Sequence, residues 1–195
     1  MKPLFFVMIY SILLLPACNR PNVHPVVAME TEAGTIQVEL YPGAAPATVT
    51  NFLTYVNRGA YDGAAFYRNV RPENQPNPVK IEVIQGGLDM VLNVDSLPPI
   101  PHESTDKTGI LHRDGVISMA RYEPGTATSE FFICVGDQPE LDFGGQRNPD
   151  GFGFAAFGQV IQGMDVVRKI HEGEVSGDFQ WLDPPVKILK VYRVR

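Results

Sequence analysis

The sequence predicts a mainly β protein, a closed barrel of short strands with two helices packed against it. Three observations favour this fold class. Gly and Pro account for 18 and 17 of the 195 residues, a share typical of a folded, loop-rich chain rather than a disordered one. Most apolar runs are short and separated by turn residues, and only two segments show the apolar spacing of a helix. A closed barrel pairs every strand edge, and so avoids the aggregation that free edges promote.

The first 17 residues are interpreted as a signal peptide outside the fold. Lys2 precedes an almost wholly apolar stretch over residues 4–17, which is shorter than the ~20 residues of a bilayer span. Residues 15–18, Leu-Pro-Ala-Cys, resemble the bacterial lipobox, in which the Cys is lipidated and becomes the mature N-terminus. We therefore expect lipidation of Cys18 and a tether over residues 18–25. The alternatives are an ordinary signal peptide with an incidental Cys and a short buried helix, which the polar residues 19–22 disfavour.

This N-terminus predicts an extracytoplasmic protein that reaches the membrane through its lipid alone. The chain carries 22 acidic and 16 basic residues, a net charge of −6, so electrostatic membrane binding is not expected. Buried acyl chains would supply the anchoring, at ~0.8 kcal/mol for each CH₂. Asn19 differs from the Asp that resembles an inner-membrane retention signal. In a host with two membranes we therefore expect the periplasmic face of the outer membrane.

The domain over residues 26–195 begins with a predicted hairpin and a helix. Strands are expected over 26–29 and 36–40, joined through the turn at 32–34. The helix begins at Pro46, a residue suited to a first helical position, and ends before Gly59. Its apolar residues recur at i, i+3, i+4 and i+7, namely Val49, Phe52, Leu53 and Val56.

The rest of the domain reads mostly as strands. A second helix is expected over residues 164–170, where apolar residues gather on one side. The remaining short β-type runs are residues 81–84, 116–120, 131–135, 155–161 and 186–194.

Several chemistries are excluded by incomplete motifs. The triplets His-Arg-Asp at 112–114 and Asp-Phe-Gly at 142–144 match a protein-kinase core, but Met119 stands where a kinase needs a magnesium-binding Asn. No Gly-rich loop or Val-Ala-Ile-Lys strand precedes them. Nucleic-acid binding is excluded by the net charge and by the lack of any basic run longer than a pair.

Metal and nucleophile chemistry also lack support. The four His residues show no paired spacing with a third ligand, and there is no Cys-x-x-Cys, so no metal site is predicted. His112 is interpreted as a structural side chain, and residues 148–151 as a turn rather than a calcium loop. Ser118 lacks the Gly-x-Ser-x-Gly context of a nucleophile. Cys134, flanked by apolar residues, is interpreted as a small buried hydrophobe rather than a nucleophile.

Several short segments of the domain are each weak evidence for any family, but their order and spacing along the chain are distinctive. Together these segments resemble the cyclophilins, the barrel-fold peptidyl-prolyl cis-trans isomerases, over about residues 26–195. The matching segments are residues 35–36, 40–42, 45–52, 59–63, 66–68, 84–87, 115–120, 129–133, 141–142 and 157–167. The resemblance implies a closed antiparallel barrel of eight strands capped by two α-helices. It also implies isomerisation of X-Pro bonds in proline-containing polypeptides, with no cofactor or metal. We expect a monomer that assists the folding of extracytoplasmic proteins.

The resemblance assigns the catalytic roles to Arg68, Gln85 and Phe132. Rotation about an X-Pro bond faces a barrier of ~18–20 kcal/mol from amide resonance. In the twisted transition state the proline nitrogen regains a lone pair, so a fixed donor beside it lowers the barrier. Arg68 suits this task because a guanidinium stays protonated and offers a rigid fork of N–H groups. Gln85 resembles the amide that holds the substrate carbonyl.

The same resemblance outlines the substrate groove. It assigns the proline-ring pocket to Phe132, Leu141 and Phe154, with Val83 and Ala120 alongside. Arg121 and Glu130 stand where the family has Asn and Gln, and both are expected to line the groove. An Arg121–Glu130 ion pair across the groove would change which substrate residues fit beside the proline.

Two further positions depart from the family pattern. The connection from Arg68 to Gln85 is long and Pro-rich. Counting back from Gln85 places Glu82 where the family has its pocket Phe, and a carboxylate would be a poor wall for a proline ring. The long connection leaves open whether Ile81 or Val83 fills that space. Glu140 aligns with a Trp that eukaryotic-type members carry.

Two alternative functions remain open at this point. Glu82, Arg121 and Glu140 could leave a catalytically weak cyclophilin domain that binds proline peptides or a partner protein without turning them over. A purely structural envelope lipoprotein is the other alternative, disfavoured because a scaffold has no evident need for Arg68, Gln85 and Phe132 together.

Overall fold

The computed structural model describes residues 24–89, 97–176 and 180–194. The predicted signal peptide, Cys18 and residues 18–23 of the tether lie outside these residues. In the described part, no helix is long and apolar enough to span a membrane. The elements follow the chain as β1 (Val26–Thr31), β2 (Gly34–Leu40), α1 (Pro46–Asn57), β3 (Ala65–Val70), the 3₁₀ turn η1 (Pro72–Asn74), β4 (Val83–Gly87), α2 (Thr105–Thr108), β5 (Val116–Met119), β6 (Phe131–Cys134), the 3₁₀ turn η2 (Pro139–Leu141), β7 (Ala155–Gln162), α3 (Met164–His171), β8 (Val175–Ser176) and β9 (Trp181–Arg193).

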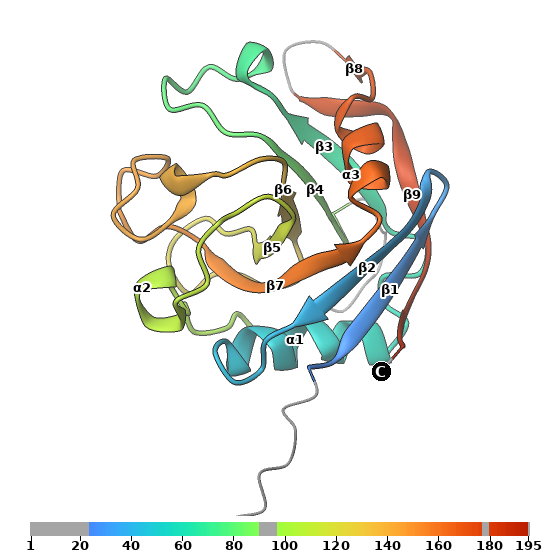
Figure 1. The fold of residues 1–195 in the computed structure, drawn as a ribbon, viewed down its shortest axis with the longest axis horizontal. Coiled ribbons are helices and arrows are strands. Elements are labelled where there is room, and N and C mark those ends of the chain that lie inside the picture. The colour runs from blue at the N-terminus through green and yellow to red at the C-terminus, as the bar shows by residue number, and fades with distance from the viewer. Residues whose placement is uncertain (1–23, 90–96, 177–179, 195) are drawn as a thin grey trace, which may run out of the picture.

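Eight of these strands form a closed antiparallel barrel (Figure 1). Neighbouring strands follow the order β1-β2-β7-β5-β6-β4-β3-β9, and β9 pairs with β1 to close the ring. The two-residue β8 pairs with β9 and lies outside the ring. The predicted eight-stranded antiparallel barrel is confirmed, as are its two main helices, α1 and α3.

Helix α1 begins at the predicted Pro46, and its buried face packs against β7 and β9. Its N-terminus has no cap from a neighbouring residue. Instead the Glu103 carboxylate accepts hydrogen bonds from the backbone N–H groups of Ala47 at 3.1 Å and Thr48 at 2.8 Å. A carboxylate satisfies free N–H groups at the positive end of the helix dipole. This cap depends on the tertiary fold, so no local sequence signal announces it.

Helix α3 lies on another side of the barrel, against β2, β3 and β4 (Figure 1). Val167 and Ile170 form its buried face. The β1–β2 hairpin fits closely beneath it, because a side chain on Gly34 would place its Cβ 2.7 Å from Val166. The predicted hairpin is present, with Thr31 opposite Gly34 at its end.

Strand β6 divides the apolar side chains into two groups, since successive residues of a strand point to opposite faces. Phe131 and Ile133 belong to the barrel core, the large buried cluster that includes Phe52, Tyr61, Phe66 and Phe157. The Phe131 ring makes edge-to-face contacts with Phe52, Tyr61 and Phe66. Phe132 and Cys134 join a second, smaller set, here called the groove cluster, which consists of Val70, Ile81, Val83, Phe132, Cys134 and Leu141.

Cys134 is unpaired and fully buried. Burial raises the pKa of its thiol well above the usual value, so the reactive thiolate is disfavoured. The interpretation of Cys134 as a buried hydrophobe is confirmed.

Several element boundaries differ from the prediction. Strand β4 begins at Val83 rather than Ile81, because the Gln75 side chain takes both backbone groups of Ile81, accepting from its N–H at 3.3 Å and donating to its carbonyl at 2.8 Å. Strand β9 begins at Trp181 rather than Val186, although Pro184 and Pro185 lie within it. Strand β3 and helix α2 were not assigned from local patterns. The turn at 148–151 is present, with a backbone hydrogen bond from Gly151 to Asn148.

Candidate active site

A cavity of about 440 Å³ opens beside β3, β4 and β6. The loops before β6 and after η2 and the start of β9 complete its walls. It is lined by all nine residues that the sequence predicted for the groove: Arg68, Val83, Gln85, Ala120, Arg121, Glu130, Phe132, Leu141 and Phe154. Their individual roles stay predictions, but the fold brings them to one place.

One end of the cavity is apolar and formed by the groove cluster. Phe132 meets the Phe154 ring edge to face, with centroids 5.3 Å apart at 90°. Leu141 is buried beside them, and Ala120 packs against the same cluster. Aromatic and aliphatic walls of this kind suit a compact apolar ring.

A buried polar network supports Phe132 from behind. The His112 ring stacks on Phe132, with centroids 5.9 Å apart and 16° between planes. Its Nε2 lies 2.9 Å from Ser118 Oγ, and its Nδ1 lies 2.7 Å from Asp142 Oδ1. These distances match a nucleophilic triad, but Ser118 is 0% exposed and His112 is 1% exposed. No substrate can reach the hydroxyl, so the network is structural, as the sequence analysis interpreted His112.

At the other side of the apolar pocket, Arg68 is clamped by two side-chain amides. Its Nη1 donates to Gln85 Oε1 at 2.8 Å, while Nε and Nη2 donate to Gln180 Oε1 at 3.0 and 2.6 Å. A guanidinium has five N–H bonds, so one on Nη1 and one on Nη2 remain for a ligand. Burial lowers the pKa of Arg68, yet a guanidinium remains protonated at neutral pH. The site therefore presents a fixed cationic donor.

Gln85 is held in turn by Tyr67. Its Nε2 donates to the Tyr67 hydroxyl at 3.0 Å, and that hydroxyl donates to the Glu130 carboxylate. Glu130 also accepts from the backbone N–H of Leu88 at 2.6 Å. Burial, followed by the nearby Asp89 charge, raises the pKa of Glu130. A chain of contacts thus links Glu130 to Arg68 through Tyr67 and Gln85.

Eight further lining residues were not predicted from the sequence: Tyr67, Asp89, Tyr122, Thr126, Thr128, Arg147, Asn148 and Trp181. Gln180, which accepts from Arg68, was not predicted either. Tyr67 and Arg68 both face the cavity because β3 is bulged there, with the pairing register shifting between Phe66 and Arg68. A bulge sets two residues opposite one and breaks the alternation on which a sequence reading depends. Gln180 and Trp181 come from the far end of the chain and have no local motif.

Comparison with known proteins identifies the family. A family described as "Cyclophilin type peptidyl-prolyl cis-trans isomerase/CLD" matches residues 26–193. Peptidyl-prolyl cis-trans isomerase A of Dickeya dadantii is 37% identical over 165 residues, which cover 83% of this chain and 78% of that protein. Peptidyl-prolyl cis-trans isomerase B of Escherichia coli is 34% identical over 154 residues, covering 78% and 87%. The chain belongs to the cyclophilins. It is a peptidyl-prolyl cis-trans isomerase of this type, as the sequence predicted.

Solved structures show the same cyclophilin fold. A cyclophilin type peptidyl-prolyl cis-trans isomerase of Cryptosporidium parvum superposes with a TM-score of 0.71 at 20% identity, covering 88% of this chain and 98% of that one. A second structure of that protein, determined in the presence of the dipeptide Ala-Pro, gives a TM-score of 0.69 at 21% identity, covering 86% and 97%.

The proposed Arg121–Glu130 ion pair is wrong for this cyclophilin. Arg121 instead makes a bidentate pair with Asp150, with Nη1–Oδ2 at 2.7 Å and Nη2–Oδ1 at 3.0 Å. Its Nε also donates to the Gly153 carbonyl at 2.8 Å. These bonds turn the guanidinium toward the loop after η2 and away from Glu130, whose carboxylate faces Tyr67. Arg121 still lines the groove, with its guanidinium 5.1 Å from the Phe154 ring.

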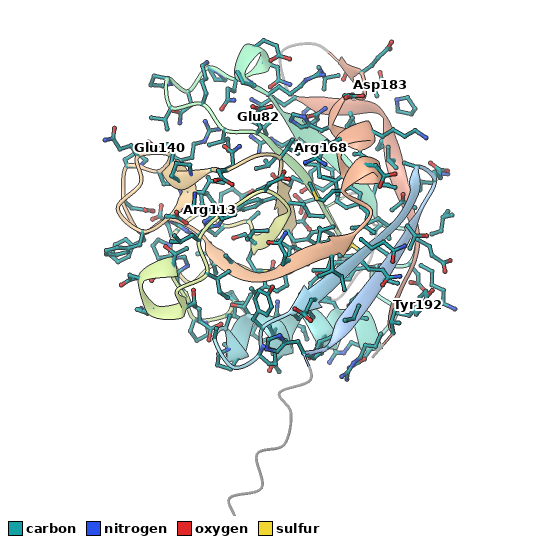
Figure 2. The ribbon with its side chains drawn as sticks, viewed as in Figure 1. Glu82, Arg113, Glu140, Arg168, Asp183 and Tyr192 are labelled. Atoms are coloured by element: carbon teal, nitrogen blue, oxygen red, sulfur yellow. The ribbon has the colours of Figure 1, made fainter. Side chains whose placement is uncertain are left out.

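The Glu82 side chain does not line the cavity. Its Oε2 lies 4.0 Å from His171 Nε2 at the end of α3, and its side chain is 42% exposed (Figure 2). Ile81 and Val83, on either side of it, line the cavity instead. Because successive side chains point to opposite sides, Ile81 and Val83 both face the groove while Glu82 points away. Both apolar residues therefore fill the space that the sequence left open between them.

Glu140 also lies away from the cavity lining. Its carboxylate accepts from the backbone N–H of Gln146 at 2.9 Å, within the loop that follows η2 (Figure 2). Of the three departures that raised the possibility of a non-catalytic groove, Arg121 alone borders the cavity.

Proposed function

We propose that this cyclophilin isomerises X-Pro bonds with Arg68 as the hydrogen-bond donor to the proline nitrogen and the groove cluster as the seat of the proline ring. The observation that carries the proposal is the clamp on Arg68. It fixes the guanidinium in the same cavity as Phe132 and leaves two N–H bonds unused.

The clamp suits the chemistry because its acceptors are neutral. Amide oxygens orient the guanidinium without cancelling its charge, as a carboxylate partner would. A twisted X-Pro bond has lost its amide resonance, so its nitrogen accepts a hydrogen bond that the planar bond cannot accept. A donor fixed at that point binds the transition state more tightly than either ground state.

The donor alone does not explain a useful rate. An acceleration of about 10⁵-fold corresponds to ~7 kcal/mol, and one preorganised donor supplies ~2.7–4 kcal/mol. The remainder must come from contacts that favour the twisted peptide. Phe132, Leu141 and Phe154 would hold the ring. Gln85 retains a second Nε2–H beyond the one given to Tyr67, which can bind the substrate carbonyl.

We propose proline-containing polypeptides as the substrates. The cavity combines an apolar end with a cationic donor, which matches a peptide presenting a proline ring and a polar backbone. The Cryptosporidium parvum relative was crystallised in the presence of Ala-Pro, a dipeptide of this class. The groove needs no second copy of the chain, which supports a monomer.

We further propose that the enzyme works outside the cytoplasm, held by a lipid on Cys18. The supporting observations are those of the sequence: the short apolar stretch, the Leu-Pro-Ala-Cys motif and the polar tether. Its clients would then be polypeptides that fold outside the cytoplasm. The structural findings on Glu82 and Glu140 remove most of the support for a groove that binds without catalysis.

The catalytic proposal is tested by the rate of cis-trans exchange in a short Ala-Pro peptide, followed by NMR with the purified protein. The wild-type protein is expected to broaden the exchanging resonances. Arg68→Ala is expected to lower kcat/KM by about 100- to 1000-fold, the loss of one preorganised donor. Arg113→Ala is the matched control, because Arg113 is exposed and pairs with Asp137 (Figure 2). Equal activity in the Arg68 and Arg113 variants would refute the donor role.

The anchor is tested by producing the full chain in a bacterium fed a labelled fatty acid. The label is expected in the membrane fraction of the wild-type protein and of Cys134→Ala. It should be lost in Cys18→Ala, while isomerase activity in the extract is retained. Label that persists without Cys18 would overturn the anchor and leave the catalytic proposal intact.

A further inference from the structure

We propose that Gln180 is a positioning residue for Arg68, and that through it the long connection between β3 and β4 aligns the donor with the groove. The inference rests on the proposed role of Arg68. Gln180 lies 112 residues from Arg68 in sequence, and its side-chain oxygen is the sole described acceptor for two of the guanidinium nitrogens, Nε and Nη2.

The hydrogen-bond partners fix the orientation of the Gln180 amide. Its Oε1 faces the guanidinium, which can only donate, and its Nε2 lies 3.0 Å from the Asn74 carbonyl, which can only accept. Rotating the amide by 180° would break both interactions. The oxygen is therefore held toward Arg68, with no competing arrangement.

The backbone of Gln180 is held as firmly as its side chain. Its carbonyl accepts from the Asn69 N–H at 2.8 Å, and the Asn74 side chain donates to the Asn69 carbonyl at 2.9 Å. Asn69 follows Arg68 directly in β3, while Asn74 ends η1 in the long connection. The three residues form a closed set of hydrogen bonds around the base of the Arg68 side chain.

Gln180 is also strained. It has a φ of 62°, the one described non-glycine residue with positive φ. Such a conformation is disfavoured for a residue with a Cβ, and glycine would adopt it freely. Strained backbone persists where surrounding contacts enforce it, often beside functional groups. A glycine at position 180 would remove the strain, but it has no side-chain oxygen to accept from Arg68.

Gln85 and Gln180 therefore accept from different nitrogens of the Arg68 guanidinium. Gln85 takes Nη1 alone, whereas Gln180 takes the Nε edge and Nη2. With Gln85 alone, the planar group could swing about a single hydrogen bond. Two acceptors on separate elements fix the plane, and with it the direction of the two unused N–H bonds.

The test compares Gln180→Met with Gln138→Met. Methionine keeps the length of the side chain and removes the acceptor. Gln138 is a buried control: it accepts from the Glu82 N–H at 3.1 Å and donates to the Val135 carbonyl at 2.7 Å, and it makes no contact with Arg68. Peptide affinity is read from the fluorescence of Trp181, the single tryptophan of the chain, which lines the cavity.

The expected result is a fall in kcat of about 10- to 100-fold for Gln180→Met, the cost of a misplaced catalytic group, with peptide affinity changed less than about threefold. The Arg68 Nε–Hε resonance should broaden or exchange faster in this variant and stay sharp in Gln138→Met. Equal kcat in the two variants, or an unchanged Arg68 resonance in Gln180→Met, would overturn the proposal.

Gln180→Gly covers the case in which the Met variant fails to fold. It removes the acceptor and relieves the positive φ, so it is expected to fold and still to lose kcat. Full activity in Gln180→Gly would refute the positioning role. An inactive wild-type protein, or activity unaffected by Arg68→Ala, would instead refute the underlying catalytic proposal, so the two failures are distinguishable.

Discussion

Phe131 and Phe132 are neighbours on the short strand β6, yet their side chains lie on opposite faces of the sheet. Phe131 is fully buried among the rings of the barrel core, whereas Phe132 lies in the groove cluster between the His112 ring and the cavity. The barrel core lies between the sheet and the buried faces of α1 and α3. The groove cluster has one side open to the cavity, where we propose that the substrate binds. The comparison shows that the same residue type fills the closed core on one face of the sheet and lines an open cavity on the other.

The largest expected effect is a difference in unfolding free energy between variants of the two faces. Phe131→Ala should lower the free energy of unfolding by about 3–5 kcal/mol, because it leaves a cavity among packed rings. Phe132→Ala should cost about half as much, since the Phe132 ring already borders a cavity. Urea unfolding of both variants measures the difference. Equal losses would mean that the groove cluster is as much a part of the core as the barrel interior.

The reverse order is expected for activity. Phe132→Ala should lower kcat/KM by about 10- to 100-fold, the loss of ~1.5–3 kcal/mol of apolar contact with the proline ring. Phe131→Ala, assayed well below its unfolding temperature, should keep activity within about threefold. NMR exchange of an Ala-Pro peptide measures both. A more damaging Phe131 variant would break the division between the faces.

Asp150 offers a smaller test of the groove wall. Asp150→Asn leaves the Arg121 guanidinium, which is 1% exposed, without its carboxylate. We expect a loss of about 1–3 kcal/mol in unfolding free energy, the cost of an unsatisfied buried charge partner. Asp137→Asn, which breaks the exposed pair with Arg113, is the control and should change stability by less than about 1 kcal/mol. Similar losses in the two variants would show that burial of the Arg121 pair is unimportant.

The smallest expected effect is a pH dependence from Glu130. Its pKa is raised in the folded state, chiefly by burial, so the folded protein holds the proton more tightly than the unfolded chain. The stabilisation is fully present below the ordinary value of 4.5 and is lost as pH rises through the raised folded value. Glu130→Gln should flatten this decline in urea unfolding at several pH values. A decline that persists in Glu130→Gln would assign it to another group.

Local patterns predicted seven of the eight barrel strands and both main helices, and missed β3. Pro46 with the spacing of Val49, Phe52 and Val56 specifies α1 by itself, and the apolar runs of β5, β6 and β7 ended within two residues of their predicted limits. These signals depend on neighbours in the chain, and a single sequence contains them. The resemblance to the cyclophilins then placed nine side chains in one groove.

What could not be predicted depends on contacts between distant residues. Glu103 caps α1 from 55 residues away, and Gln180 reaches Arg68 across 112. The Arg121–Asp150 pair formed because a turn carried Asp150 to the groove wall, where the sequence suggested Glu130. The bulge in β3 put Tyr67 on the same side as Arg68. In each case a residue with an unremarkable local context acquired its role through tertiary placement.

The central claim is that a guanidinium fork, held in one orientation, stabilises the twisted X-Pro bond. Its most direct test is the kcat of Arg68→Lys in the NMR exchange assay. Lysine keeps the positive charge but lacks the planar fork that Gln85 and Gln180 hold. The account predicts less than about a tenth of wild-type kcat, with peptide affinity nearly unchanged. A Lys variant within about threefold of the wild-type kcat would contradict it, because charge alone would then be sufficient.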